Sequence, residues 1–486
     1  MSTLSICLIA FYVINILMTI SVLFLERKET RQALLWIFAF FAIPVVPWIL
    51  YFFIGKGPKL NRRNWAKRKA ISDENIRKQA ILGNINHYIG DDDEERQMIS
   101  LNENNGFFCT TYNETKIYCD AHEMYKDQIK DIKNAKKSIN VLYYIFRTDK
   151  VGRYFLDVLT EKAKEGVEVI LVFDDSANPK MTYRFLKKFI NAGGKVQPFF
   201  PSRLTRIGHN FAYRNHRKIV VIDGVIGYIG GMNIGKEYLS MHKKIKPWRD
   251  THLRIVGEAV CLLQIRFFQD LSGAKPYYSK KKRTTGFEEV FAKNMVTFPS
   301  FDKENVSPIQ IVSSGPDSLK EEIKLAYLKM IGLAKKSLVL QTPYFIPDKG
   351  FIDALIVSKH SGVDVKLVIP GVPDKKVVYH VTYSYLEEIL KAGIEVYLYP
   401  GFLHSKMIVI DESVTSIGTA NLDERSFSWN FEVNAFIYDK EVSKEAMIIA
   451  KNDIEKSRLL TFEDYKKRPI KDKFLENLFR LFSPLM

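Results

Sequence analysis

The chain has 486 residues, of which 47% are hydrophobic and 13% aromatic, and it carries a formal net charge of +17. This length allows two or three domains, and the apolar content is high for a purely soluble protein. The charge implies a polyanionic partner, either nucleic acid or an anionic lipid surface. The four cysteines have no CxxC spacing and indicate neither a disulfide framework nor a zinc site.

Two uncharged stretches lie within residues 1–55. Residues 4–25 and 33–54 are each 22 residues long, which as helix gives about 33 Å against a hydrocarbon core of about 30 Å. A cleaved signal peptide is the alternative for the first stretch, but "MSTLS" has no basic residue and no A-x-A site follows. Pro44 and Pro47 fall in the second stretch, where a membrane tolerates kinks. We therefore predict two transmembrane helices in residues 1–55.

The segment that follows is strongly basic. Seven Lys or Arg residues fall among residues 55–69, whereas the connection between the two stretches, "ERKETRQ", has three. The positive-inside rule then predicts a multi-pass protein whose main body lies in the cytoplasm. Basic residues beside a membrane attract anionic headgroups, which favours lipid over nucleic acid as the partner. Residues 56–105, which include the acidic run "DDDEER", are predicted to be a basic juxtamembrane segment and linker.

An internal repeat occupies the rest of the chain. "AKKSINVLYYIF", "GVEVILVFDD" and "FINAGGKVQPFFP" in one half are echoed by "AKKSLVLQTPYFIP", "GVDVKLVIPG" and "ILKAGIEVYLYP" in the other. Short β-branched runs alternate with helical segments, which is typical of buried strands in an α/β sheet. The predicted strands are residues 139–146, 167–173, 338–340 and 365–369. We expect repeat 1 in residues 106–298 and repeat 2 in residues 299–486, with helix-flanked β-sheets related by a pseudo-two-fold axis.

One spacing motif occurs once in each repeat. "YRNHRKIVVIDGVIGYIGGMNIG" and "GFLHSKMIVIDESVTSIGTANLDERSF" share the pattern His-x-Lys-x4-Asp-x6-Gly-x2-Asn, and every matching pair is 188 residues apart. The pairs are His216 and His404, Lys218 and Lys406, Asp223 and Asp411, Gly230 and Gly418, and Asn233 and Asn421.

The motif combines groups that suit a phosphodiester. Its histidine and lysine are two residues apart on a predicted strand and project from the same face, and a hairpin could bring the asparagine beside the histidine. Two such sets supply imidazoles, ammonium groups and amides for the oxygens of a phosphate. One histidine can attack phosphorus while the other protonates the leaving alkoxide and then deprotonates the acceptor.

Acidic residues should hold the far nitrogen of each imidazole and fix its tautomer. Glu432 in "NFEVN" and Asp250 in "WRDTH" are placed for this task. Asp223 and Asp411 are candidate catalytic residues by their place in the motif, and a structural role at the strand ends explains them equally well. No His, Cys or carboxylate cluster has metal-ligand spacing, so we expect no metal and no cofactor.

These motifs resemble those of the phospholipase D superfamily, in which HxK(x)4D occurs twice per active site. The likeness is greatest to bacterial cardiolipin synthases, through the two N-terminal spans and "RNHRKIVVIDG", "GGMNIG", "WRDTHLRIVG", "HSKMIVID" and "GTANLDERSF". It covers essentially the whole chain. It implies a phosphatidyltransferase of the bacterial cell membrane that joins two phosphatidylglycerols into cardiolipin and releases glycerol without a metal.

The resemblance also implies roles for single residues. Thr419 stands where repeat 1 has Gly231, so only repeat 2 is expected to offer a hydroxyl to the phosphate. We take His216 as the nucleophile as a hypothesis. The resemblance makes His216 and His404 the catalytic imidazoles, Lys218, Lys406, Asn233 and Asn421 the phosphate-binding residues, and Asp250 and Glu432 the residues that orient the rings.

Three alternatives stay open at this point. A hydrolytic phospholipase D would use the same chemistry with water as the acceptor. A nuclease of the same superfamily fits the basic charge, but two membrane spans argue for a lipid substrate, and we expect no nucleic acid partner. A non-enzymatic lipid-binding module is disfavoured because both motifs are complete.

Overall fold

The computed structural model of the chain describes residues 3–25, 30–43, 45–51, 86–199, 213–242, 245–273, 306–318, 320–481 and 483. The basic run at residues 55–69 and the predicted boundary between residues 298 and 299 lie outside the described residues.

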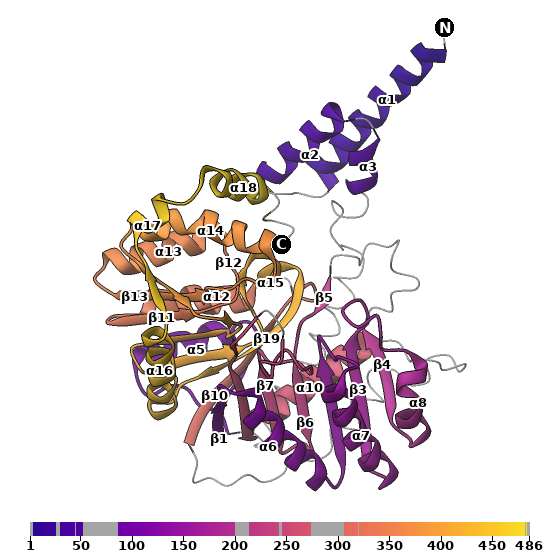
Figure 1. Cartoon of the computed structure of the whole chain (residues 1–486), viewed down its shortest axis with the longest axis vertical. Coiled ribbons are helices and arrows are strands. Elements are labelled where there is room, and N and C mark those ends of the chain that lie inside the picture. Colours follow the sequence, from indigo (N-terminus) through magenta and orange to yellow (C-terminus); the bar gives the residue numbers. More distant parts are fainter. Residues whose placement is uncertain are drawn as a thin grey trace.

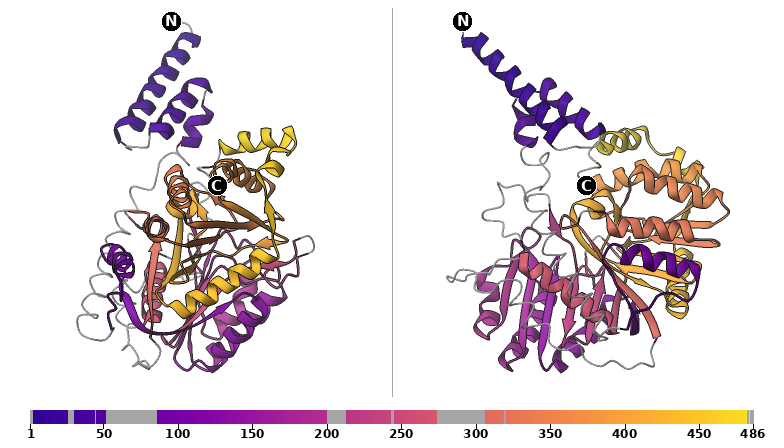
Figure 2. Two further views of the ribbon diagram at one scale, coloured as in Figure 1. Left: turned by 90° about the vertical axis from the view of Figure 1, so that its left-hand side faces the viewer. Right: turned by 180° about the vertical axis from the view of Figure 1, so that it is seen from behind.

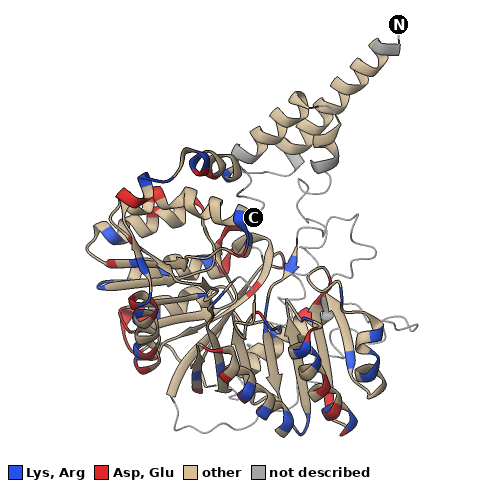
Figure 3. Cartoon of the chain, viewed as in Figure 1, with Lys and Arg blue, Asp and Glu red and all other residues tan. Residues whose placement is uncertain are grey.

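The N-terminal helices form an arm that projects from one end of the molecule (Figures 1 and 2). Helix α1 (Thr3–Ile20) continues as a π-helical turn, η1 (Ser21–Leu25). Residues Ser5–Leu23 are mostly exposed, and they form a helix long and apolar enough to cross a membrane. Figure 3 shows no charged residue along α1, whereas the helices of the body carry charges of both signs. The first predicted span is therefore a helix of membrane-crossing length.

The second predicted span, residues 33–54, is not one continuous helix. Helix α2 (Thr30–Ala42) has 13 residues and is therefore about 20 Å long, which is shorter than the hydrocarbon core. At Val45 φ is 64°, and a separate helix, α3 (Val46–Leu50), begins there with a proline in its first turn. Trp48 Nε1 donates a hydrogen bond of 2.7 Å to Asn15 Oδ1 of α1. Pro47 lies in the first turn of α3, where a missing N–H costs little. The second stretch is therefore divided into two short helices, and α3 packs back against α1.

Part of the predicted linker belongs to the folded body. Residues 93–103 form α5 (Asp93–Glu103), whose N-cap Asp92 accepts from Glu95 N. The acidic run is the first turn of this helix, where negative charge is favourable. Met98 and Ile99 are buried against α12 (Glu322–Leu333). The prediction of a linker up to residue 105 is therefore wrong for α5, since the polar run hid a helix start.

Repeat 1 has the predicted order of strands and helices, followed by the motif on a hairpin. The strands predicted at residues 139–146 and 167–173 are β2 and β3, with bounds that differ by a few residues. The elements are β1 (Cys109–Tyr118), α6 (Ala121–Asn134), β2 (Ser138–Tyr143), α7 (Lys150–Lys164), β3 (Glu168–Asp174), α8 (Tyr183–Asn191), β4 (Lys195–Phe199), β5 (Arg214–Asn215), β6 (Ile219–Ile222), β7 (Ile226–Gly230), β8 (Trp248–Arg249), β9 (His252–Gly257) and α10 (Ala259–Gly273).

Repeat 2 follows the same order and ends in short extra helices. The strands predicted at residues 338–340 and 365–369 are β11 and β13. Besides α12, the elements are β10 (Val306–Ser314), β11 (Ser337–Gln341), β12 (Phe345–Ile346), α13 (Lys349–His360), β13 (Asp364–Pro370), α14 (Lys376–Lys391), β14 (Glu395–Tyr399), β15 (Phe402–Leu403), β16 (Met407–Ile410), β17 (Val414–Gly418), β18 (Leu422–Asp423), α15 (Glu424–Ser428), β19 (Asn430–Ile437), α16 (Lys440–Glu455), β20 (Arg458–Leu460), α17 (Phe462–Lys466) and α18 (Ile470–Arg480).

Both repeats contribute to a single sheet with a mirrored strand order. The order is β20-β14-β13-β11-β16-β17-β19-β10 in repeat 2, continuing as β1-β9-β7-β6-β2-β3-β4 in repeat 1. The antiparallel pair β1 and β10 joins the halves at the centre. Counted outward from this central pair, each strand of repeat 1 has its counterpart at the same position in repeat 2, as a pseudo-two-fold relation requires.

Helices cover both faces of the sheet (Figures 1 and 2). Helices α10 and α16 pack on one face, over a core that runs through both repeats. The other face is covered by α6, α7 and α8 in repeat 1 and by α12, α13 and α14 in repeat 2. The strands are buried on both faces because helices lie on both, which explains their continuous apolar runs.

Asp223 and Asp411 occupy equivalent turns after β6 and β16. Each has φ near 50°, in the left-handed region, which Asp tolerates better than most residues. The Asp411 carboxylate accepts from the backbone N–H groups of Lys335, Lys336 and Ser337 at 2.7–2.8 Å. Asp223 accepts in the same way from residues 136–138. Both aspartates therefore tie the motif hairpin to the start of a neighbouring strand, which is the structural role.

We predict that Asp411→Ala destabilises the fold without changing the chemistry. Three backbone donors lose a charged acceptor, and because two of them are exposed we expect a loss of roughly 1–3 kcal/mol in the free energy of unfolding. Asp411→Asn should lose less, since it keeps one carbonyl acceptor and tolerates the turn. Thermal unfolding in detergent, together with activity per folded molecule, checks this. A drop in activity beyond about tenfold in folded protein would contradict it and return Asp411 to the catalytic set.

Candidate active site

The two motifs meet at a cavity of about 450 Å³ between the repeats. Both motif histidines and both motif asparagines line it. The other lining residues used below are Tyr144, Tyr238, Trp248, Val378 and Phe402.

Two short parallel strand pairs bring each histidine to an acid of the other repeat. Strand β5 pairs with the start of β19, with Asn215 opposite Phe431. Strand β15 pairs with β8, with Leu403 opposite Arg249. The residues that follow these pairs are His216 and Glu432 in the first case. In the second case they are His404 and Asp250. The predicted orienting residues are thus exchanged between the repeats.

The resulting pairs are short and buried. His216 Nδ1 lies 3.0 Å from Glu432 Oε2 and 2.9 Å from Oε1. His404 Nδ1 lies 2.6 Å from Asp250 Oδ2. Both acids are almost fully buried. Because each Nδ1 is held by a carboxylate, Nε2 is the nitrogen that remains for a substrate, which is the arrangement of a base and its orienting acid.

Burial controls the charge of these groups. Burial lowers the pKa of His216 to about 4, although the charge of Glu432 opposes this. Burial and the charge of Lys406 lower the pKa of His404 to about 3. Burial alone would raise the pKa of Asp250, but the charges of His404 and Lys406 hold it below its ordinary value. Both imidazoles are therefore neutral near pH 7, the form in which Nε2 can attack or accept a proton.

The motif lysines lie behind the histidines. Lys218 Nζ donates to the backbone carbonyl of His216 at 2.7 Å, and Lys406 Nζ donates to that of His404. Burial lowers the pKa of Lys218 to about 7 and that of Lys406 to about 8. Neither residue is among those that line the cavity. Their direct contact with a phosphate stays a prediction.

The motif asparagines differ between the repeats. Asn233 Oδ1 accepts from Ile145 N at 3.0 Å and Nδ2 donates to the Tyr238 hydroxyl at 2.6 Å, which leaves one N–H of this amide for a ligand. Asn421 Oδ1 is buried and has no hydrogen-bond partner among the described residues. Both side chains border the cavity, which is where a phosphate would bind. Their role as phosphate donors stays a prediction.

The structure places Thr419 differently from the sequence prediction. Its hydroxyl donates to Glu432 Oε2 at 2.6 Å and is buried, rather than facing the cavity. In repeat 1 a Cβ on Gly231 would lie 1.9 Å from Asp250 Oδ1. Gly231 and Thr419 are equivalent positions in the two repeats. Thr419 packs beside Glu432, whereas at Gly231 the space for a side chain is already filled by the Asp250 carboxylate. The difference between the repeats therefore concerns how each acid is held and not a hydroxyl for the phosphate.

Several neighbours of the site were not found from the sequence. Three aromatic rings surround His404, with centroid distances of 5.4 Å to Trp248, 5.7 Å to Phe402 and 6.0 Å to Tyr238. The Tyr144 ring lies 4.7 Å from His216. Their only signal was proximity to a motif, as in "KPWRD" and "GFLH".

A buried arginine also supports one of the acids. Arg217 Nη1 pairs with Asp270 Oδ1 at 2.6 Å, and its Nε donates to the backbone carbonyl of Glu432 at 3.0 Å. This fixes the strand that carries the acid. Within the described residues, no three His, Cys, Asp or Glu side chains are grouped so that they could hold a metal ion.

Comparison with known proteins identifies the class of this fold and site. The family model described as "Cardiolipin synthase, PLD-like domain" matches residues 128–245 and 327–454, once in each repeat. The model "Phospholipase_D-nuclease N-terminal" matches residues 13–56. Phosphatidylserine synthase from Haemophilus influenzae superposes with a TM-score of 0.61 at 16% identity, over 80% of this chain and 100% of that one. The fold is thus that of the phospholipase D superfamily.

Curated relatives narrow the class further. The chain is 40% identical to the major cardiolipin synthase of Bacillus subtilis over 100% of both chains. It is 41% identical to cardiolipin synthase 2 of Staphylococcus epidermidis over 99% of this chain and 98% of the relative. The chain therefore belongs to the cardiolipin synthases of the phospholipase D superfamily, which are phosphatidyltransferases of phospholipid biosynthesis.

The close approach at Gly231 gives a testable prediction. Gly231→Ala places a methyl group where the Asp250 carboxylate lies, so the acid and the His404 ring must shift. A displacement of about 1 Å in a catalytic group costs on the order of 100-fold in rate, and we expect kcat to fall by at least that factor. Gly332→Ala is the control, because open space surrounds a Cβ at that position. Steady-state kinetics check both, and a kcat for Gly231→Ala within about twofold of the wild type would contradict the prediction.

Proposed function

We propose that the cavity transfers a phosphatidyl group from one phosphatidylglycerol to another, which gives cardiolipin and glycerol. The observation that carries this is the pair of imidazoles in one cavity, each held at Nδ1 by a buried acid of the other repeat. Two such groups suffice for a double displacement at phosphorus.

The proposed reaction has two balanced steps. His216 Nε2 attacks the phosphorus of the donor lipid and forms a phosphoramidate bond, while the P–O bond to the glycerol headgroup breaks and His404 gives a proton to the leaving oxygen. His404 then takes the proton of a glycerol hydroxyl on the second phosphatidylglycerol. The oxygen of that hydroxyl attacks phosphorus, and His216 leaves as neutral imidazole.

Substrate binding favours uptake from solvent of the proton that the first step needs. Both imidazoles are neutral in the free site because burial lowers their pKa values. A phosphodiester brings a negative charge between them, which favours a protonated imidazole and raises its pKa. His404 can then act as an acid only when the donor lipid is bound.

The lysines make the reaction sensitive to alkaline pH. The pKa of Lys218 is about 7 and that of Lys406 about 8 in the free site. Each ammonium loses its proton and its positive charge as pH rises through its pKa, so we predict that kcat/KM begins to fall near pH 7 and falls more steeply above about pH 8. The bound phosphate raises both pKa values, so the decline in kcat should occur at higher pH. Profiles of kcat and kcat/KM that decline at the same pH, or a kcat/KM that still rises at about pH 9, would contradict this.

Membrane association follows from α1 and from the family, and we propose a finer topology. Helix α1 crosses the membrane, α2 and α3 form a broken second span, and the catalytic body lies in the cytoplasm of a bacterial cell. The basic run at residues 55–69 supports this orientation by the positive-inside rule.

Product analysis tests the proposed reaction. Membranes that contain the protein are incubated with phosphatidylglycerol and a chelator, and the products are identified by mass, with His404→Ala as the control. Cardiolipin plus glycerol, absent in the control, is expected. Phosphatidic acid without cardiolipin would make the protein a hydrolase, and activity on DNA with none on lipid would make it a nuclease.

A further inference from the structure

The C-terminal helix α18 exposes an apolar face to solvent. Ile470 is 84% exposed, Phe474 64%, Leu478 39% and Leu481 70%. The spacing of four, four and three residues places these side chains on one side of the helix. Four large apolar side chains in one stripe differ from the scattered apolar residues of an ordinary surface.

The opposite face of α18 is fixed to the body. Glu476 is buried, and its two carboxylate oxygens accept from Arg468 Nε and Nη2 at 2.9 and 2.6 Å. Arg480 Nη1 donates to the backbone carbonyl of Ser384 in α14 at 2.9 Å. The Arg480 guanidinium also lies 4.5 Å from the ring centroid of Tyr385. The outward direction of the apolar stripe is therefore set by the fold.

The place of α18 indicates what covers the stripe. All views show α18 at the end of the body that carries the N-terminal arm (Figures 1 and 2). The arm contains the helix that can cross a membrane, so this end of the body is the one nearest the bilayer. Lys467 and Lys471 are exposed next to the stripe, and lysines flanking an apolar helix face are typical of helices that lie on anionic lipid.

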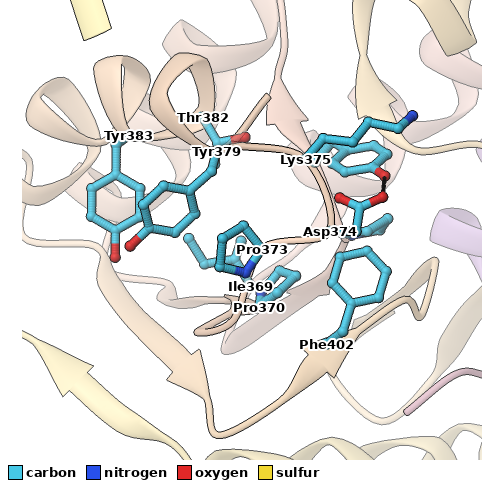
Figure 4. A pocket seen from close by; sticks show the side chains of 11 residues that line it. Ile369, Pro370, Pro373, Asp374, Lys375, Tyr379, Thr382, Tyr383 and Phe402 are labelled. Atoms are coloured by element: carbon cyan, nitrogen blue, oxygen red, sulfur yellow. Dashed lines mark hydrogen bonds between the residues drawn. The ribbon is translucent and has the colours of Figure 1, made fainter. Parts of the chain in front are cut away.

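Helix α14 connects α18 with the active site. It contacts α18 through His380, Ser384 and Tyr385, and Val378 of α14 lines the main cavity. Figure 4 shows a smaller pocket that is lined by Tyr379, Thr382 and Tyr383 of α14 on one side and by Pro373 and Phe402 on the other. Phe402 borders both the small pocket and the main cavity. A helix α18 that rests on the bilayer would thus hold the part of the cavity wall that Val378 forms close to the lipid surface.

We propose that α18 is an interfacial helix that lies in the headgroup region of an anionic bilayer, with Ile470, Phe474, Leu478 and Leu481 inserted among the lipids. It forms a second contact with the membrane, separate from the N-terminal arm. Through α14 it keeps the catalytic cavity against the surface from which lipid substrates enter. The contact with lipid does not depend on the proposed reaction, whereas its effect on turnover rests on the proposed function.

The first experiment measures depth in the bilayer. The full chain is placed in vesicles of phosphatidylglycerol and phosphatidylcholine with an environment-sensitive label on Phe474→Cys, in a background where Cys7 and Cys119 are serine. Cys109 and Cys261 are buried. The matched control is Ile448→Cys on α16, which is 58% exposed and lies away from the arm (Figure 1).

Lipids with a nitroxide on the acyl chain should quench the label at position 474 at least about twofold more than the label at position 448. Equal quenching at the two positions would overturn the proposal. A label at position 474 that is shielded from aqueous iodide but not quenched by the lipid would show that another protein or a second copy covers the stripe, which would also overturn it.

The second experiment separates surface binding from catalysis. We expect Phe474→Ser with Leu478→Ser to lower kcat/KM on bilayer phosphatidylglycerol by about three- to tenfold. The rate on a short-chain phosphatidylglycerol dispersed below its micelle concentration should not change. Ile448→Ser should match the wild type on both substrates.

The outcomes of this second experiment distinguish the two proposals. An equal loss on both substrates would mean that the serines act through the packing of α14, and would overturn the interfacial role. If the wild type transferred phosphatidyl groups on neither substrate, the proposed function would be overturned. The quenching result would still decide whether α18 contacts lipid.

Discussion

Replacing either motif histidine by alanine is expected to reduce phosphatidyl transfer by at least about 10⁴-fold, as the removal of one member of a catalytic set does elsewhere. His216→Ala removes the proposed nucleophile, and His404→Ala removes the acid and base. The cavity has no other imidazole among its lining residues, so within the described chain nothing adjacent can substitute. Initial rates of cardiolipin formation, with folding checked by thermal unfolding, measure the loss.

The two variants should differ in the intermediate that they accumulate. With a phosphatidylglycerol labelled in its phosphate, His404→Ala should still form a covalent adduct on His216 slowly, because the leaving alkoxide can take a proton from water when the acid is missing. The adduct should then persist, because no base activates the acceptor hydroxyl. His216→Ala should trap no label. Label on His404 in His216→Ala, with none in the converse variant, would reverse the assignment. A residual rate within about 100-fold of the wild type in either variant would contradict the shared mechanism.

Much of this site could be predicted from the sequence because it depends on regular spacing. Each motif strand alternates in a way that fixes which side chains share a face, and the 188-residue repeat predicts two equivalent hairpins. The exchange of acids between the repeats could not be predicted. It depends on strands β5 and β15, of two residues each, which are too short to leave a periodic pattern.

The wrong prediction for Thr419 has its cause in packing between segments that lie far apart in the sequence. Thr419 was expected to offer a hydroxyl to the phosphate because it stands where repeat 1 has Gly231, but its hydroxyl forms hydrogen bonds with Glu432 and the backbone of Val433. The difference of one methylene between Asp250 and Glu432 determines whether a side chain fits at the position of Gly231. Such packing between distant segments has no counterpart in local sequence.

The orienting acids give the second large expected effect. Asp250→Asn is expected to lower kcat by about 10²–10⁴-fold with a smaller change in KM, since an amide cannot stabilise the imidazolium form of His404. The same holds for Glu432→Gln and His216. The charges of Asp250 and Glu432 raise the pKa values of their partner histidines. Removing either charge must therefore lower the pKa of the partner histidine further. The loss of activity should be greatest in the step that needs a protonated His404, which is departure of the headgroup.

This effect can be separated from a general loss of stability. Glu258→Gln is the matched control, because Glu258 is equally buried and accepts from the backbone N–H groups of Asn86, Thr111 and Tyr112, away from the cavity. It should destabilise the protein and leave kcat per folded molecule unchanged. Glu432 also accepts from Thr419 and Ser426, so Glu432→Gln leaves several donors facing one carbonyl oxygen, and we expect it to cost more stability than Asp250→Asn. If Asp250→Asn kept kcat within about tenfold of the wild type, His404 would not need its acid, and the exchange of acids between the repeats would serve only to hold the two halves together.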